Sequence, residues 1–358
     1  MRLKDKEILF VVPTLTGGGA ERVVSILSNA LVNRGYKVNL LLNVRCNNEY
    51  FIDPKVKVYT ISESNQVKAG IAGKLSRIKC RYLLTKQINP DITITFLSDA
   101  IQFLCNIPLK GKFVSTVRVN PCAGTASYKA LKNLVISLSD ACLVQNIEQK
   151  SYFHKFIQKK TYILSNPIQQ CSFVEKPVIN KTLKKIITLG RLTEQKNHRM
   201  LIDAFKIAKE QNDELILEIY GLGEEKENLE NQIKSLNLQR SVFLKGRTDN
   251  AKQKLSESDL FVLSSNYEGM PNALLEAMAA GVPSISTDCP TGPSDIIENN
   301  VNGILIETNN KDELAKAILK MQDESFRRIV SKNGQEFVKK NYSVDMIVNR
   351  LVKILEQI

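Results

Sequence analysis

Short apolar runs alternate with segments of helical spacing from the start of the chain. Residues 8–12 form the first run, which is rich in β-branched and aromatic side chains and is typical of a buried parallel strand. After a loop over residues 13–19, apolar residues recur with helical spacing between Ala20 and Leu31. A second apolar run follows at residues 38–42. Strand, helix and strand in this order predict a βαβ unit and therefore a parallel sheet.

The same alternation continues along the chain, stops, and then starts again. Further strands of the first series are predicted over residues 92–96, 113–117 and 141–144. The periodicity ends near Pro167, and we interpret the polar segment that follows as a linker. A second series then predicts strands over residues 186–189, 215–220, 242–244, 260–263 and 282–286, with helices over 197–211, 225–236 and 272–280.

Two successive βα series predict two Rossmann-like domains, which is also the expectation for a chain of 358 residues. We assign residues 1–165 to the N-terminal domain and residues 166–340 to the C-terminal domain. Residues 341–358 are expected to form a helix that packs back on the N-terminal domain. The predicted fold class is α/β, with the two domains facing each other across a cleft where ligands bind beyond the carboxyl ends of the strands.

The composition narrows the classes of protein that fit. No run approaches the ~18 unbroken apolar residues of a membrane span, and the N-terminus lacks the apolar core of a signal peptide, so we expect a cytoplasmic protein. The seven cysteines are scattered without a Cys-x-x-Cys pair, which favours reduced thiols over disulfides or zinc. The chain has only two histidines, which argues against a histidine-based metal cluster. No Asp-x-Asp triplet is present either, so we expect no donor-binding metal, and we expect no cofactor.

The formal net charge of +13 suits nucleic acid, an anionic membrane surface or phosphorylated ligands. No zinc finger, aromatic RNA-binding signature or long basic tail is present, so we expect no nucleic-acid partner. Residues 68–87 combine the apolar residues Ile71, Leu75, Ile78 and Tyr82 with the basic residues Lys68, Lys74, Arg77, Lys79, Arg81 and Lys86. Two interpretations stay open: a helix that lies on the inner face of the membrane, or a surface helix that packs its apolar side on the N-terminal sheet.

A glycine-rich loop precedes the first predicted helix. Gly18 and Gly19 follow the first strand, where glycine lets the backbone approach a ligand and the helix N-terminus offers N–H groups to an anion. The loop does not match Gly-x-Gly-x-x-Gly, and the second strand ends at Leu42 and Asn43 without an acidic residue for a nicotinamide ribose. These departures argue against a dehydrogenase.

Two cations follow the first strand of the second series. Arg191 can bind a diphosphate as a planar fork and Lys196 as a point charge, although a solvated basic loop is the alternative. Gly221 follows a later strand and provides a turn that can approach a nucleotide base.

The strongest signal lies after the strand predicted at residues 260–263. Glu268 precedes a loop and could reach a sugar, while Glu276 lies in the helix that follows, where a carboxylate can bind ribose hydroxyls and nearby N–H groups can bind phosphate. The loop and the helix start between the two glutamates comprise Gly269, Met270, Pro271 and Asn272.

These motifs occur in the order seen in family 4 retaining glycosyltransferases. The chain resembles this family over nearly its whole length. The most specific point of resemblance is the Glu-x7-Glu pair formed by Glu268 and Glu276. The resemblance implies a GT-B fold and a nucleotide-sugar donor, commonly a UDP-sugar, bound mainly by the C-terminal domain. It also implies that Arg191 and Lys196 bind the diphosphate, Glu276 the ribose and Glu268 the donor sugar. The loop from Gly269 to Asn272 and Gly221 would complete the donor site, with Gly18 and Gly19 near the phosphate.

The implied activity is transfer of a sugar, with retention, to a glycan or lipid-linked acceptor in polysaccharide, capsule or lipopolysaccharide biosynthesis. Many family members place a histidine in the N-terminal domain near the reacting sugar, whereas this chain has Arg118. That arginine is expected to stabilise leaving-group charge or position the acceptor. The alternatives are a sugar-nucleotide epimerase of the same fold and a nucleotide-binding protein without catalysis; the scarcity of histidine counts against the epimerase.

Overall fold

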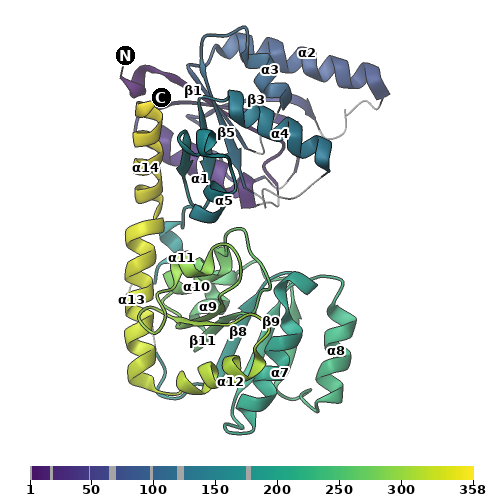
Figure 1. Ribbon diagram of the computed structural model, residues 1–358, viewed down its shortest axis with the longest axis vertical. Helices are drawn as coiled ribbons and strands as arrows, with labels where there is room; N and C mark the ends of the chain where they lie inside the picture. The colour runs from purple at the N-terminus through teal and green to yellow at the C-terminus, as the bar shows by residue number, and fades with distance from the viewer. Residues whose placement is uncertain are drawn as a thin grey trace. The chain divides into compact units, whose positions relative to one another are not determined.

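The computed structural model describes residues 2–16, 19–47, 49–63, 70–96, 100–118, 125–174 and 179–358. The chain divides into two compact units (Figure 1). The N-terminal unit comprises Met1–Pro167 together with Val344–Ile358, and the C-terminal unit comprises Ile168–Ser343. Each unit is a parallel sheet with helices, which confirms the predicted pair of Rossmann-like α/β halves.

The N-terminal unit contains a seven-stranded sheet in the order β3-β2-β1-β4-β5-β6-β7, in which every neighbouring pair is parallel. Its strands are β1 (Glu7–Val12), β2 (Lys37–Arg45), β3 (Lys57–Glu63), β4 (Ile92–Phe96), β5 (Lys112–Val117), β6 (Ala141–Val144) and β7 (Thr161–Ile163). Its helices are η1 (Leu3–Asp5), α1 (Gly19–Asn33), α2 (Gly70–Ile88), α3 (Ala100–Asn106), α4 (Ala126–Leu138), α5 (Ile147–Ser151), α6 (Lys155–Gln158) and α14 (Val344–Gln357).

The last helix, α14, belongs to the core of the N-terminal unit. Ile347 and Leu351 are fully buried and share one apolar cluster with Ile8 of β1 and Leu27 of α1. At the start of α14, the guanidinium of Arg34 pairs with the Asp345 carboxylate at 2.5 Å. The apolar stripe of α14 therefore completes the cover of the N-terminal sheet on the side of α1.

The C-terminal unit contains a six-stranded parallel sheet in the order β10-β9-β8-β11-β12-β13. Its strands are β8 (Lys185–Leu189), β9 (Ile216–Tyr220), β10 (Val242–Gly246), β11 (Leu260–Leu263), β12 (Ser284–Thr287) and β13 (Ile304–Ile306). Its helices are η2 (Gln170–Ser172), η3 (Glu194–Lys196), α7 (His198–Lys209), α8 (Lys226–Ser235), α9 (Ala251–Ser256), α10 (Asn272–Ala279), α11 (Pro293–Ile296), α12 (Lys311–Lys320) and α13 (Glu324–Tyr342).

The order of the strands determines where the polar loops meet. Strands β9, β8 and β11 are neighbours in the C-terminal sheet and run parallel, so their carboxyl ends share one edge. The loops that follow these three strands carry Arg191, Gly221 and Glu268. The predicted donor-binding residues of this domain are thus collected at the edge where open α/β sheets bind ligands.

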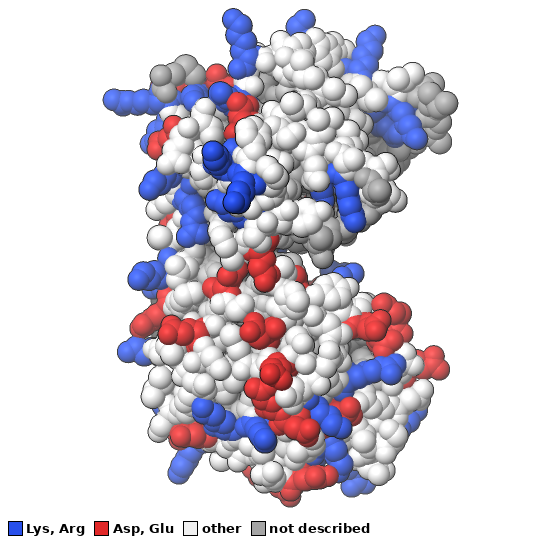
Figure 2. All heavy atoms as spheres, viewed as in Figure 1, with Lys and Arg blue, Asp and Glu red and all other residues white. Residues whose placement is uncertain are grey.

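The positive charge is concentrated in one unit. The N-terminal unit holds 26 of the 50 Lys and Arg residues but only 12 of the 37 Asp and Glu residues, so it carries a formal charge of +14. Figure 2 shows the same contrast, since basic side chains outnumber acidic ones on the visible face of the N-terminal unit and mix with them on the C-terminal unit. Among the described helices, none has both the length and the apolar character needed to cross a membrane.

Candidate functional site

The loop after β8 holds the two predicted phosphate-binding cations. Its backbone is joined to the loop after β9, because the N–H of Leu192 donates to the carbonyl of Leu222 at 3.0 Å. Glycine is required at this junction: a Cβ on Gly221 would lie 1.8 Å from the carbonyl oxygen of Gly190. The two loops therefore pass as close as backbones can, and Arg191 projects from the first of them as an exposed side chain.

The aliphatic stem of Lys196 lies over Gly190, where an added Cβ would come within 3.2 Å of the Lys196 Cδ and Cε. The Lys196 ammonium then reaches Glu268, with 2.5 Å between Nζ and Oε1. The Ser265 hydroxyl donates to the same oxygen at 2.5 Å. Side-chain exposures of 15% for Lys196 and 6% for Glu268 make this a nearly buried ion pair, which brings together two residues that are 72 positions apart in the sequence.

The loop between Glu268 and α10 is held by the segment that follows β12. The hydroxyl of Thr291 donates to the carbonyl of Glu268, and the N–H of Glu268 donates to the carbonyl of Pro290 at 3.2 Å. Gly292 has a φ of +104°, and a Cβ there would lie 2.6 Å from Pro271 Cδ. The segment therefore fixes the Gly-Met-Pro loop, which contains Gly269 and Met270, before Asn272 begins the helix.

A cavity of about 500 Å³ opens beside this loop junction, within the range of small-molecule sites. Three predicted donor-binding residues line it: Arg191, Gly221 and Glu276. Gly190 also lines the cavity and lies under the stem of Lys196, so it connects the cavity to the Lys196–Glu268 pair. The structure thus brings the C-terminal predictions together as an open cavity with an adjacent ion pair.

Sequence reasoning missed several residues of this cavity. Its wall also contains Leu189, Tyr220, Leu222, Arg247, Thr248 and Ala251. Arg247 and Thr248 come after β10, an edge strand whose residues alternate in burial and end in a polar loop without a recognisable motif. Only the pairing of β10 with β9 places that loop beside Gly221.

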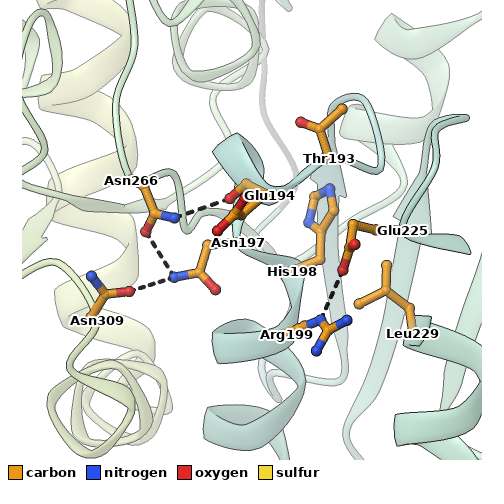
Figure 3. Close-up of a pocket in the computed structure, with 9 residues that line it drawn as sticks. All are labelled: Thr193, Glu194, Asn197, His198, Arg199, Glu225, Leu229, Asn266 and Asn309. Carbon is orange, nitrogen blue, oxygen red and sulfur yellow. Dashed lines mark hydrogen bonds and ion pairs between the residues drawn. The ribbon is translucent and has the colours of Figure 1, made fainter.

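A second cavity, of about 380 Å³, lies along the segment that carries Lys196 (Figure 3). Side-chain amides form a hydrogen-bonded network along this cavity. Asn197 Nδ2 donates to Asn266 Oδ1 at 2.9 Å and to Asn309 Oδ1 at 2.8 Å. Asn266 in turn donates to the carbonyl of Glu194 at 3.0 Å. The network ties the turn that carries Lys196 to the loop that leads to Glu268, and it positions the ion pair.

Both histidines of the chain, His154 and His198, have structural positions. His154 precedes α6, and its Nδ1 accepts from the N–H of Phe156 at 3.4 Å. His198 begins α7 as a buried side chain, and burial lowers its pKa to about 4. Its imidazole is therefore neutral at physiological pH and adds no charge beside Lys196.

The predicted N-terminal site residues lie in the other unit. Gly18 is outside the described residues, and Gly19 is the exposed first residue of α1. Arg118 directly follows β5 and is buried, with its Nη1 donating to Leu164 O and Asn166 Oδ1, each at 3.0 Å. Its guanidinium lies 4.9 Å from the centre of the Phe96 ring.

Arg118 is only partly satisfied by these contacts. In the described part of the chain, its Nε and Nη2 have no hydrogen-bond partner. Burial lowers its pKa to about 10, so the group stays protonated at neutral pH. Three N–H groups of this fixed, charged guanidinium, one on Nε and two on Nη2, are therefore buried without an acceptor among the described residues.

Known proteins with similar sequences identify the class of enzyme. Residues 171–337, nearly the whole C-terminal unit, match the family of glycosyl transferases group 1. A Campylobacter jejuni protein, the GalNAc-alpha-(1->4)-GalNAc-alpha-(1->3)-diNAcBac-PP-undecaprenol alpha-1,4-N-acetyl-D-galactosaminyltransferase, is 26% identical, with 98% of this chain and 99% of the relative covered. The protein is a glycosyltransferase.

Two further comparisons extend this result for the glycosyltransferase. The UDP-Gal:alpha-D-GlcNAc-diphosphoundecaprenol alpha-1,3-galactosyltransferase of Escherichia coli is 34% identical over 45% of this chain and 46% of its own. The crystal structure of HepE from Anabaena in complex with UDP is 16% identical, with a TM-score of 0.81 over 98% of this chain and 100% of HepE. This structural likeness confirms the predicted GT-B fold. None of these names supports the alternative of a sugar-nucleotide epimerase.

Proposed function

We propose that this glycosyltransferase is a retaining enzyme of family 4 that transfers a sugar from a UDP-sugar to a lipid-linked glycan. The observation that carries the proposal is the cavity of the C-terminal unit, which joins Arg191, Gly221 and Glu276 to the Lys196–Glu268 pair. A cation, a close-packed backbone turn and a carboxylate are the groups that a nucleoside diphosphate requires. The UDP complex of HepE and the undecaprenol-linked substrates in the names of the relatives support the choice of donor and acceptor.

The site residues of the C-terminal unit each bind a different part of the donor in this proposal. Arg191 projects beside the cavity as a guanidinium fork for the diphosphate, and Glu276 on α10 accepts hydrogen bonds from the ribose hydroxyls. Lys196 has three N–H donors, of which Glu268 takes one, so the ammonium is held in place with donors left for phosphate oxygens. Cationic and backbone N–H groups then neutralise the diphosphate as it leaves.

Glu268 serves the donor sugar in this proposal. Lys196 and Ser265 both bind its Oε1, which leaves Oε2 to accept from a sugar hydroxyl. The Gly-Met-Pro loop adds backbone N–H groups before α10, where the helix dipole favours an anion. The carboxylate is thereby fixed by two contacts before the substrate arrives, which limits the reorganisation that transfer requires.

Arg118 acts on the acceptor side in this proposal. Its Nη1 is fixed by Leu164 and Asn166, so the remaining N–H groups are preorganised to bind a negatively charged or hydroxyl group of the acceptor. The roles of Gly18 and Gly19 near the phosphate stay predictions.

A transfer assay tests the function. The purified enzyme is incubated with UDP-glucose, UDP-galactose, UDP-N-acetylglucosamine or UDP-N-acetylgalactosamine and an undecaprenyl-diphosphate-linked glycan in detergent, and the products are analysed by mass spectrometry and NMR. We expect an α-linked product from one UDP-sugar. A β-linked product would exclude retention, and an epimerised sugar nucleotide without acceptor would support the epimerase instead.

Arg118→Lys should lower turnover with UDP affinity unchanged. Equal turnover in the variant and the wild type would show that Arg118 has no part in transfer.

We propose that transfer requires no metal ion, because Arg191 and Lys196 supply two positive charges where the diphosphate binds. We expect turnover to be unchanged within about twofold after extensive dialysis against EDTA. Calorimetric titration with UDP should likewise give the same Kd with and without Mg²⁺. Loss of turnover on chelation, with recovery on addition of Mg²⁺ or Mn²⁺, would contradict this prediction.

A further inference from the structure

Helix α2 packs against the N-terminal sheet with polar as well as apolar side chains. Arg81 is buried, and its Nη2 donates to Asn43 Oδ1 on β2 at 2.5 Å. One turn later Thr85 is fully buried and accepts from the side chain of Gln102 on α3 at 3.0 Å. The apolar residues of α2 are divided between the two sides. Leu84 and Ile88 pack against the sheet cluster of Leu9, Val11 and Leu41, whereas Leu75 is 61% exposed. The interpretation that α2 packs apolar residues on the sheet therefore holds for its C-terminal half, whereas Leu75 and Ile78 of the predicted apolar side stay exposed.

The residues predicted for the apolar face of α2 thus point largely to solvent. Ile78 and Leu83 are exposed together with Leu75, whereas Tyr82 is half-buried. The side chain of Ile71 lies outside the described residues. Arg81, predicted among the basic residues of the outer face, instead points to the sheet because Asn43 offers it a buried acceptor.

Helix α3 repeats the arrangement. Gln102 and Asn106 are buried, and Asn106 Nδ2 donates to Thr93 Oγ1 on β4 at 2.7 Å. On the outer side, Leu104 and Ile107, which directly follows the helix, are each 63% exposed. Both helices therefore bury several of their polar side chains beside part of their apolar ones, and they leave the remaining leucines and isoleucines exposed.

Helix α4 continues the same surface. It buries Val135 and Ile136 while Leu131, Leu134 and Leu138 are exposed. Helix α3 contacts α2 on one side and α4 on the other (Figure 1). The exposed leucines and isoleucines of α2, α3 and α4 thus form one surface, here called the apolar surface, of a kind that monomeric proteins in water rarely leave uncovered.

Basic side chains surround this surface. Lys74, Lys79 and Lys86 are exposed on α2, and Lys110 is exposed in the loop between α3 and β5. The whole N-terminal unit carries +14 while the C-terminal unit is close to neutral. Apolar side chains within a basic rim match the chemistry of a bilayer whose headgroups are anionic.

We propose that the apolar surface of α2, α3 and α4 docks on an anionic lipid bilayer. The leucines and isoleucines enter the boundary between headgroups and acyl chains, and the surrounding lysines bind lipid phosphates. This proposal rests on the proposed function in one respect: a lipid-linked acceptor lies in that bilayer, so docking on it brings the N-terminal unit to the substrate. The lysine contribution is electrostatic and is screened by salt.

Vesicle flotation tests the proposal without using transfer activity. The intact enzyme is floated with phosphatidylcholine vesicles that either contain or lack phosphatidylglycerol. We expect flotation with the anionic vesicles only, and less at high salt. The triple variant Leu75→Gln, Leu104→Gln and Leu134→Gln should lose at least about tenfold in vesicle affinity, since it removes apolar contacts from all three helices.

Matched variants separate this surface from unspecific effects. Phe156 and Ile329 are 64% and 56% exposed outside the three helices, and changing both to Gln should leave flotation unchanged. Lys74→Glu, Lys79→Glu and Lys86→Glu should abolish flotation, whereas the same change of charge at Lys252, Lys311 and Lys316 in the C-terminal unit should not.

Three outcomes would overturn the proposal. Unchanged flotation of the glutamine triple variant would show that lipid binds elsewhere, and equal loss in both lysine variants would show attraction by net charge alone. A dimer that the triple variant dissociates, without flotation of the wild type, would show that a second copy covers the surface. UDP affinity and turnover on an acceptor in detergent should be unchanged in the triple variant, so failure of transfer there concerns the proposed function and not the docking surface.

Discussion

Glu276→Ala should lower kcat/KM for transfer by roughly a hundredfold or more and leave the enzyme folded. The expected loss is about 2–3 kcal/mol of transition-state stabilisation, the worth of hydrogen bonds to a charged group. Glu276 lies on α10 at the wall of the donor cavity and is only partly buried, so its removal leaves no large void in the core. The measurement is steady-state transfer with the donor found in the assay above, beside thermal unfolding of the same preparation.

A conservative variant tests whether the charge of Glu276 is needed for transfer. Glu276→Gln keeps the shape and the hydrogen-bonding oxygen but removes the charge, so its turnover should lie between those of the wild type and Glu276→Ala. UDP affinity should fall in both variants, because the ribose belongs to UDP as well as to the sugar donor. Wild-type kcat/KM in the purified Ala variant would show that the ribose is bound by other groups.

Lys196→Met should weaken UDP binding by roughly 10- to 100-fold, the equivalent of losing a charge-assisted contact to phosphate. It should also destabilise the C-terminal unit by about 3 kcal/mol, because the nearly buried carboxylate of Glu268 is left without its cation. Calorimetric titration with UDP measures the first effect and urea-induced unfolding the second.

The double variant Lys196→Met with Glu268→Gln distinguishes the two roles of the pair. Since neither charge remains, most of the lost stability should return, whereas UDP affinity should not. Lys185→Met is a matched control, because it breaks another ion pair of β8, to Glu218 at 3.0 Å, at the end of the strand that lies away from the site. Wild-type affinity for UDP in Lys196→Met would show that the phosphate is bound without this lysine.

The sequence by itself determined the elements whose signal is local. Strands β1 and β6 are nearly continuous apolar runs, and β4 is a fully buried run rich in β-branched residues, because strands of a parallel sheet are covered on both faces. Arg191, Glu268 and Glu276 could be found because each lies directly after a recognisable strand or in the helix that follows it. Strand β3 was missed because its sequence, Lys-Val-Tyr-Thr-Ile-Ser-Glu, is an edge strand of mixed polarity.

Only the tertiary structure could decide what depends on partners from distant segments. Lys196 and Glu268 were given separate roles by the sequence, and sheet pairing between β8 and β11 joins them into one ion pair. The orientation of α2 is the clearest case. Helical spacing revealed an apolar side, but Asn43 on β2 and Thr93 on β4 present polar side chains to the overlying helices. Buried polar groups must be hydrogen-bonded, so Arg81, Gln102 and Asn106 turn inward to meet them. Leu84 and Ile88 still pack on the sheet beside these polar groups, whereas other leucine and isoleucine side chains of the two helices are left outside.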